Sequence, residues 1–210
     1  MITVLFKSIK KIHLTIVNLL IISGFAIGEP IGGVIESTGV TSLVRESERL
    51  ESDVGTDVNI YDEAETANGR MLIEFLDEEK LSLTENSLVY IDEAYYDPDP
   101  SKSKMAISMV RGTARFASGA GNRIKKQNVD VSTPTANITM RGTDFTTTID
   151  ELGRTMVVLL PDEETGASSG EIVVYNDGGE VVLTEAYSAT VVSSYDTPPT
   201  QSVIIQGITP

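Results

Sequence analysis

NVDVSTPTANITMRGTDFTTTID, residues 128–150, is the stretch whose pattern decides the fold. Apolar residues recur there at every second position, first at Val129 and Val131 and then over residues 136–140. A period of two is typical of half-buried β-strands, because successive side chains point to opposite faces of a sheet. The alternation resumes over residues 145–149, so the stretch predicts three short strands in succession.

Two residues mark the breaks between these strands. Pro134 has no N–H to donate to a neighbouring strand, so we expect it at a strand start or at a sheet edge. Gly142 stands between Arg141 and Thr143, and a glycine inside a strand pattern indicates a bulge or a tight bend. We therefore expect Gly142 to lie at a bend where a side chain would not fit.

The tripeptide Arg-Gly-Thr occurs twice, at residues 111–113 and 141–143, each time shortly before a phenylalanine. If the match is more than chance, it predicts the same bend in successive coils of a repeating β fold, where each coil buries its apolar side against its neighbours. A guanidinium at such a bend binds carbonyl or carboxylate groups. Arg111 and Arg141 are therefore interpreted as ties between coils, with recognition of a partner as the alternative.

The rest of the chain after residue 28 has a similar rhythm. Short apolar runs recur at intervals of about eight to ten residues and are separated by turn residues such as Asn68-Gly69. Met71, Ile73 and Phe75 then alternate on one predicted strand face. No segment shows the helical period of 3.6. The sequence predicts an all-β domain, a solenoid-like or sandwich-like stack of short strands behind an N-terminal signal segment.

The stretch from Thr133 to Phe145 resembles the signature of FecR-like domains, the periplasmic part of ferric-citrate-type regulators and of other envelope proteins. The resemblance extends from about Gly33 to about Thr190. It implies a solenoid-like domain that binds other proteins and signals, without catalysis. Together with Arg111 and Gly112, the candidate interaction residues that it indicates are Thr133, Pro134, Arg141, Gly142, Thr143 and Phe145.

Residues 1–28 have the features of a secretory signal peptide. Three lysines come first, an apolar stretch runs from Leu14 to Ile27, and small residues precede Glu29. The apolar stretch is shorter than the roughly 20 residues of a spanning helix, and an uncleaved anchor is the alternative. The predicted organisation is a signal peptide at 1–28, a FecR-like domain at 29–193 and a C-terminal tail at 194–210. The tail has one apolar patch, which either docks on the domain or acts as an interaction strand.

The net charge of the chain limits the kinds of binding partner that we expect. The formal net charge is −15, and removal of the three lysines in residues 1–28 leaves 13 basic against 31 acidic residues, or −18. So acidic a surface repels phosphate backbones and anionic lipid headgroups, which argues against nucleic acid and against membrane association after cleavage. We therefore expect either another envelope protein or a second copy of the chain as partner, in the periplasm or outside the cell.

The sequence offers little for catalysis. It has no cysteine, and its only histidine, His13, lies in the signal segment. The exported chain would lack the commonest general base, the commonest transition-metal ligand and the thiol nucleophile. Asp97 and Asp99 lie in a predicted long loop, residues 92–104, without the glycine and glutamate of a calcium-binding EF-hand loop. We predict no catalytic residue, no metal site and no cofactor.

Two functional hypotheses follow. The first is an exported, non-catalytic FecR-like module that binds proteins or acts as a sensor. The second is a structural component that assembles with itself in an envelope, a surface layer or a virion. A glycan-active enzyme with paired carboxylates is a further alternative, although the sequence singles out no pair. Sigma-factor control is not expected, because the family's sigma-factor regulators have a cytoplasmic region and a spanning helix ahead of the domain.

Export predicts a processed N-terminus. We expect the mature protein to begin near Glu29, because the small residues Ala26 and Gly28 provide an exit for signal peptidase. Mass spectrometry of the intact protein, recovered from the periplasm or the medium, measures this. An unprocessed N-terminus in the membrane fraction would contradict it.

Overall fold

The computed structural model describes residues 29–99, 102–118, 129–162, 166–168 and 170–206. These residues form 17 β-strands and no α-helix, which confirms the all-β prediction. None of their elements is a helix long and apolar enough to span a membrane. The predicted signal segment lies outside the described residues.

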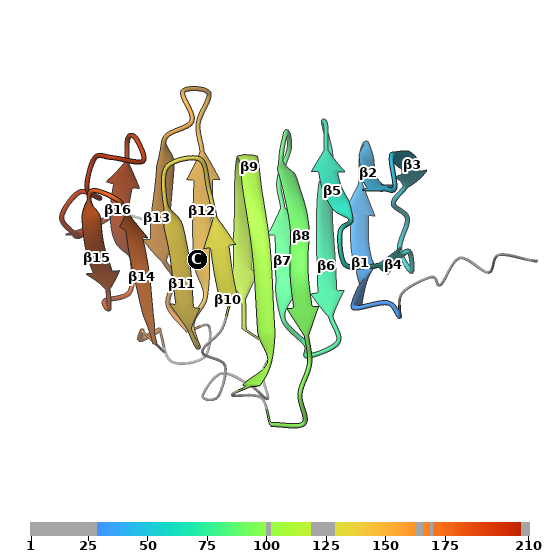
Figure 1. Ribbon diagram of the computed structural model, residues 1–210, viewed down its shortest axis with the longest axis horizontal. Helices are drawn as coiled ribbons and strands as arrows, with labels where there is room; N and C mark the ends of the chain where they lie inside the picture. Colours follow the sequence, from blue (N-terminus) through green and yellow to red (C-terminus); the bar gives the residue numbers. More distant parts are fainter. Residues whose placement is uncertain (1–28, 100–101, 119–128, 163–165, 169, 207–210) are drawn as a thin grey trace, which may run out of the picture.

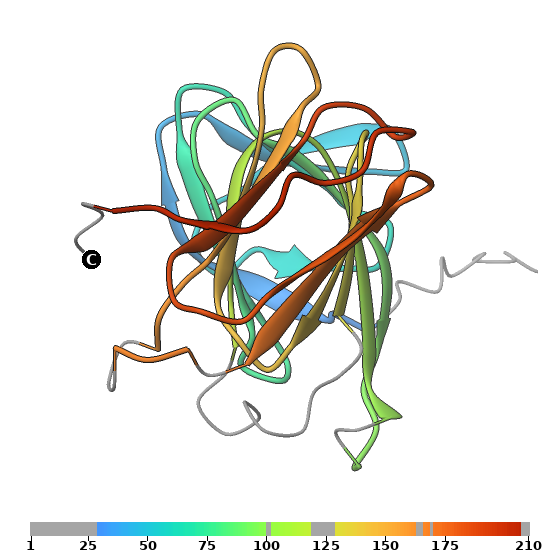
Figure 2. The ribbon, with the colours of Figure 1, turned by 90° about the vertical axis from the view of Figure 1, so that its left-hand side faces the viewer.

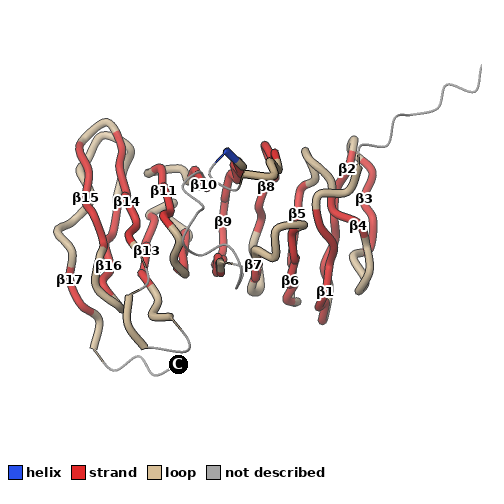
Figure 3. The backbone as a smooth tube through the Cα atoms, turned by 90° about the horizontal axis from the view of Figure 1, so that it is seen from below, coloured by secondary structure: helices blue, strands red, loops and turns tan. Residues whose placement is uncertain are grey.

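Strand pairing divides the strands into two sheets that lie face to face, here named sheet A and sheet B (Figure 3). One long strand, β9 (Lys104–Ala117), belongs to both. In spatial order, sheet A contains β4 (Asp57–Val58), β1 (Gly32–Thr38), β6 (Arg70–Phe75), β7 (Lys80–Leu83), the second half of β9, β12 (Phe145–Ile149), β13 (Thr155–Leu159), β16 (Ser188–Val192) and β17 (Val203–Ile204). Sheet B contains β3 (Glu48–Glu51), β2 (Thr41–Arg45), β5 (Glu63–Thr66), β8 (Leu88–Tyr95), the first half of β9, β10 (Val129–Ser132), β11 (Asn137–Arg141), β14 (Glu171–Asn176) and β15 (Gly179–Leu183).

The chain passes back and forth between the sheets, one or two strands at a time, while it advances along the long axis (Figure 1). Seen along that axis, the strands of the two sheets surround the interior (Figure 2). The fold therefore has the two facing sheets of a sandwich, and its strands are added one after another along a single axis as in a solenoid, so it shares a feature with each of the two architectures that the sequence left open.

Apolar side chains that alternate along the strands meet between the two sheets. Met71, Ile73 and Phe75 are buried, as their spacing predicted, and they belong to one core with Ile107 and Ile138 of sheet B. Burial of each such side chain contributes about 1.5–3 kcal/mol. Because both sheets contribute to the same core, neither sheet is stable on its own.

The first Arg-Gly-Thr copy is the point where β9 changes sheets. Leu88 of β8 pairs with Arg111 and the next residue of β8 pairs with Met109, so Val110 is an extra residue at a bulge. Gly112 has a φ of +91°, a left-handed conformation that favours glycine. From Gly112 onward the strand pairs in sheet A, with β7 and β12.

The second copy performs the same change of sheet without a continuous strand. Gly142, with a φ of +65°, lies between β11 of sheet B and β12 of sheet A. Because β10 is parallel to β9 and antiparallel to β11, β9 and β11 run in opposite directions. Both lead from sheet B into sheet A, but they leave sheet B at opposite edges. The expectation of one bend repeated in successive coils was therefore wrong in its geometry: the copies lie at opposite edges of the sandwich.

Two segments differ in extent from the sequence prediction. The loop expected at residues 92–104 is shorter, because a bulge after Ile91 lets β8 continue pairing with β9 as far as Tyr95. Within the predicted tail, residues 203–204 form β17 on sheet A. The tail is also held by Asn176, whose side-chain amide donates to carbonyls of Ser194 (3.0 Å) and Thr197 (2.7 Å).

Gly112 provides a test of the bend. We expect Gly112→Ala to lower the free energy of unfolding by about 2–4 kcal/mol, because a Cβ would meet Ser87 and the carbonyl of Asn86 in addition to the strained φ. Gly153→Ala is the matched control, since Gly153 also has a positive φ (+79°) but an added Cβ meets nothing within 4 Å. It should cost only about 1 kcal/mol. Urea denaturation measures both, and equal losses would contradict the proposed clash.

Candidate interaction surface

The eight candidate residues do not form a single site. Val129 of β10 pairs with Met140 of β11 on one side and with Met105 of β9 on the other, so these residues lie at the same level. Arg111 lies six residues further along β9. At about 3.3 Å per residue this separates the backbones of Arg111 and Arg141 by roughly 20 Å. The backbone of Arg141 ends β11, and its side chain is outside the described part of the structure.

Thr133 and Pro134 begin the turn between β10 and β11. The Thr133 hydroxyl donates to the carbonyl of Ala136 (2.8 Å) and accepts a hydrogen bond from the Thr155 hydroxyl of β13 (2.9 Å). The Thr135 hydroxyl lies 2.7 Å from that of Thr155. These hydroxyls tie a turn of sheet B to a strand of sheet A, which is a structural role.

The last residues of the FecR-like signature, 143–145, are buried and contact side chains of β9. Thr143 and Phe145 are fully buried, and the Phe145 ring stacks on Phe116 at a centroid distance of 4.7 Å. Asp144, which the sequence analysis did not single out, is nearly buried and pairs with Arg115 at 3.2 Å. This part of the signature therefore packs the interior and is not available to a partner.

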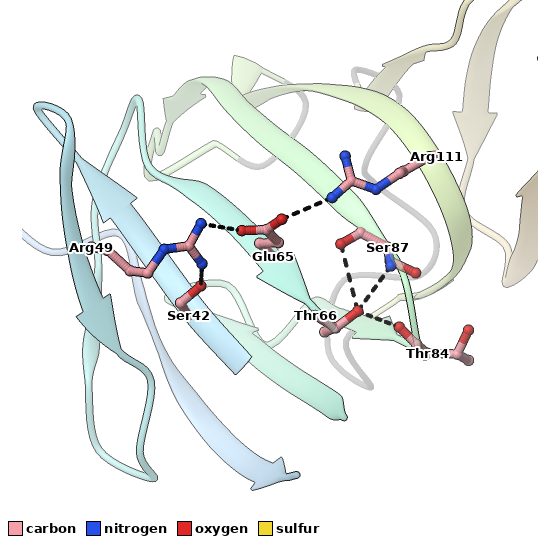
Figure 4. Close-up of polar contacts among 7 residues, drawn as sticks. All are labelled: Ser42, Arg49, Glu65, Thr66, Thr84, Ser87 and Arg111. Carbon is pink, nitrogen blue, oxygen red and sulfur yellow. Dashed lines mark hydrogen bonds and ion pairs between the residues drawn. The ribbon is translucent and has the colours of Figure 1, made fainter. Parts of the chain in front are cut away.

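Arg111 belongs to an ion-pair cluster on the outer face of sheet B (Figure 4). Its guanidinium donates to one carboxylate oxygen of Glu65 at 2.8 Å, and Arg49 binds the other oxygen at 2.6 Å. Arg49 also donates to the hydroxyl of Ser42 at 2.5 Å. Two arginines from β3 and β9 thus share one carboxylate on β5, and we name Arg49, Glu65 and Arg111 the arginine cluster.

The cluster is exposed at its arginines and sheltered at its carboxylate. The side chains of Arg49, Arg111 and Glu65 are 62%, 47% and 24% exposed. The pKa of Glu65 is lowered, first by the hydrogen bond from Arg49 and further by the charge of Arg49 and the hydrogen bond from Arg111, while partial burial opposes the shift. The carboxylate is therefore ionised at neutral pH and holds both guanidiniums in place.

A network of hydroxyl groups fixes the backbone beside Arg111 (Figure 4). The Thr66 hydroxyl donates to the carbonyl of Thr84 (2.5 Å) and accepts from the N–H of Ser87 (2.9 Å). The Ser87 hydroxyl in turn accepts from the N–H of Thr113 (3.0 Å) and donates to its carbonyl (3.1 Å). Arg111 therefore projects from a bend that both sheets hold rigidly.

What the cluster offers chemically is hydrogen-bond donation. Its charged groups are hydrogen-bond donors of fixed geometry, which suit binding of carboxylates or carbonyls. It contains no nucleophile and no general base of shifted pKa near neutrality. The described residues also contain no group of three or more His, Cys, Asp or Glu side chains that could hold a metal ion.

Comparisons with known proteins found a match to one family model and a likeness in fold to solved structures. Residues 62–162 match the family model described as FecR protein. Two crystal structures of a candidate anti-sigma factor from Parabacteroides distasonis are similar to this chain, each at 14% sequence identity and a TM-score of 0.50. The match covers 66% of this chain and 57% of that one, so it spans little more than half of that protein. Comparison with curated proteins found no match.

Glu65 gives the cluster a measurable pH dependence. Because its folded-state pKa lies below the ordinary 4.5, the stabilisation from its charge is complete above pH 4.5 and is lost as the pH falls through the lower folded-state value. Glu65→Gln should therefore reduce the free energy of unfolding at neutral pH, by about 0–1 kcal/mol for each exposed pair. The difference from the parent should shrink below pH 4.5, as measured by denaturation across pH.

A double-mutant cycle controls for other effects of the substitution. In a background of Arg49→Gln and Arg111→Gln, Glu65→Gln should have a much smaller effect at neutral pH. An undiminished effect in that background would show that Glu65 acts through something other than the arginine cluster.

Proposed function

Since the chain contains a FecR-like domain, we propose that it is a non-catalytic regulatory module that acts by binding another protein of the cell envelope. The matched segment, residues 62–162, includes β5, β9 and both Arg-Gly-Thr bends. The fold is also similar to that of a candidate anti-sigma factor, and anti-sigma factors regulate by binding a protein. Family and fold together support regulation through protein binding.

The proposed location is the periplasm or the cell exterior. Family members are typically envelope proteins, and residues 1–28 have the features of an export signal. An exported chain without cysteine needs another source of rigidity, and the extensive core and the hydroxyl networks between the sheets supply it.

The observation that carries this proposal is the arginine cluster. Two guanidiniums already held by Glu65 lose little freedom on binding, so their hydrogen bonds to a partner are offset by little conformational entropy. Arg111 is flanked by the exposed Val110, which adds apolar contact area at the bulge of β9. We propose that the partner covers the outer face of sheet B at Arg111 and Val110 and presents carboxylate or carbonyl groups to the arginines.

Arg111→Ala tests this surface. The variant should melt within a few degrees of the parent, because an exposed ion pair contributes only about 0–1 kcal/mol. In a pull-down from envelope extract with the purified chain as bait, it should lose the partner that the parent retains, as quantified by mass spectrometry. Arg111→Lys should recover part of the binding, since it restores the charge without the planar fork.

Arg70→Ala is the matched control, because Arg70 forms an exposed pair with Glu85 at 3.0 Å on β6 of sheet A. It removes the same side chain and the same kind of ion pair from the other sheet, so it should leave capture unchanged. A partner captured equally by Arg111→Ala would place the docking surface elsewhere. An extract that returns no specific partner for the parent would contradict protein binding itself.

A further inference from the structure

We propose that two copies of this chain associate through β17, edge to edge, so that sheet A continues from one copy into the other. This inference does not depend on the function proposed above, since it concerns the other sheet and the C-terminal end of the molecule.

The strand β17 is the last strand of sheet A. Val203 pairs with Ala189 and Ile204 pairs with Ser188 of β16, and β16 is the one strand in the described part of the chain that pairs with β17. The N–H of Ile205 bonds to the carbonyl of Tyr187 at 3.0 Å. Because backbone groups alternate in direction along a strand, the N–H and C=O of Ile204 point away from β16, toward the open edge.

The side chains at this edge are apolar and exposed, at 60% for Val203 and 54% for Ile204. An exposed edge with apolar side chains is a template for pairing with another strand. The edges at the other end of the molecule are different, since β3 carries Glu48, Arg49 and Glu51 and β4 carries Asp57. Charged side chains of that kind protect an edge against pairing, whereas β17 has no such protection.

The charge distribution favours a second copy as the occupant of this edge. The chain has a net charge of −15, so most contacts between two copies would bring carboxylates together. Residues 197–210, in contrast, contain no Asp, Glu, Lys, Arg or His. Two copies can meet along residues 202–206 of this uncharged segment without placing like charges against each other.

The geometry of β17 is self-complementary. A two-fold axis beside Ile204 would let the Ile204 residues of both copies exchange N–H···O=C bonds as an antiparallel pair. Ser202 of each copy would then face Gln206 of the other, and uncharged polar side chains would flank the paired isoleucines. Such an isologous contact closes after two copies, so it gives a dimer and not a fibre.

Sedimentation velocity over a range of protein concentrations tests the proposal. The parent should form a dimer whose dissociation constant decreases when salt is raised from about 0.05 M to about 0.5 M, because salt screens the repulsion between acidic copies. Ile204→Pro should weaken dimerisation by about tenfold or more, since it removes the outward N–H on each side of the axis. The bonds to β16 remain in that variant, so its circular dichroism and melting temperature should stay close to those of the parent.

A pair of charge variants makes the test independent of proline. Ile204→Glu should abolish the dimer, whereas Val54→Glu should leave it intact. Val54 is similarly exposed (66%), but it lies between β3 and β4 at the opposite end of the molecule (Figure 1). A parent that stays monomeric at all concentrations and salts would overturn the proposal and leave the edge to a strand of a different protein. A dimer that survives Ile204→Pro or Ile204→Glu would overturn it as well.

Discussion

The bend at Gly112 is the constraint on which the two-sheet architecture depends. A strand can leave one sheet and enter the facing one only if its backbone turns sharply while its hydrogen bonds continue, and here a bulge at Val110 followed by a left-handed glycine provides the turn. The close approach of Ser87 and Asn86 leaves no room for a side chain. Since β9 is the strand common to both sheets, its bend fixes how they face each other over the core.

Short side-chain hydroxyls reinforce the places where the chain crosses between sheets. Ser87 bonds both backbone groups of Thr113 at the first crossing, and at the same edge Thr133, in the turn between β10 and β11, contacts Thr155 of the opposite sheet. Each such bond contributes only about 0.5–1.5 kcal/mol, but its loss would leave buried polar groups unpaired. In a chain without cysteine, these networks perform the positional role that disulfides have in many exported proteins.

Local pattern was enough to predict strands, burial and bends, but not which strands become neighbours. The period of two placed Met71, Ile73 and Phe75 in the core, and the glycines of both Arg-Gly-Thr copies have the positive φ that a bend needs. Arg111 could be singled out from the sequence because it stands beside one of these glycines. Its partner Glu65 could not be predicted, because Glu65 lies near Arg111 only through the order of β5, β8 and β9 in sheet B. The two crossings lie at opposite edges because β9 pairs with β10 in parallel, and no local signal encodes that pairing.

The two surfaces proposed to bind a protein differ in charge. The arginine cluster offers charged donors on sheet B within a strongly acidic chain, so contacts made there depend on electrostatic attraction and weaken as salt rises. The edge at Ile204 is uncharged and belongs to sheet A, so the association proposed there would be opposed by net charge and would strengthen as salt rises. Because the two surfaces lie on different sheets and respond to salt in opposite directions, occupation of one does not require the other. If both proposals hold, the protein can pair with itself through sheet A while the arginine cluster on sheet B stays open to another partner.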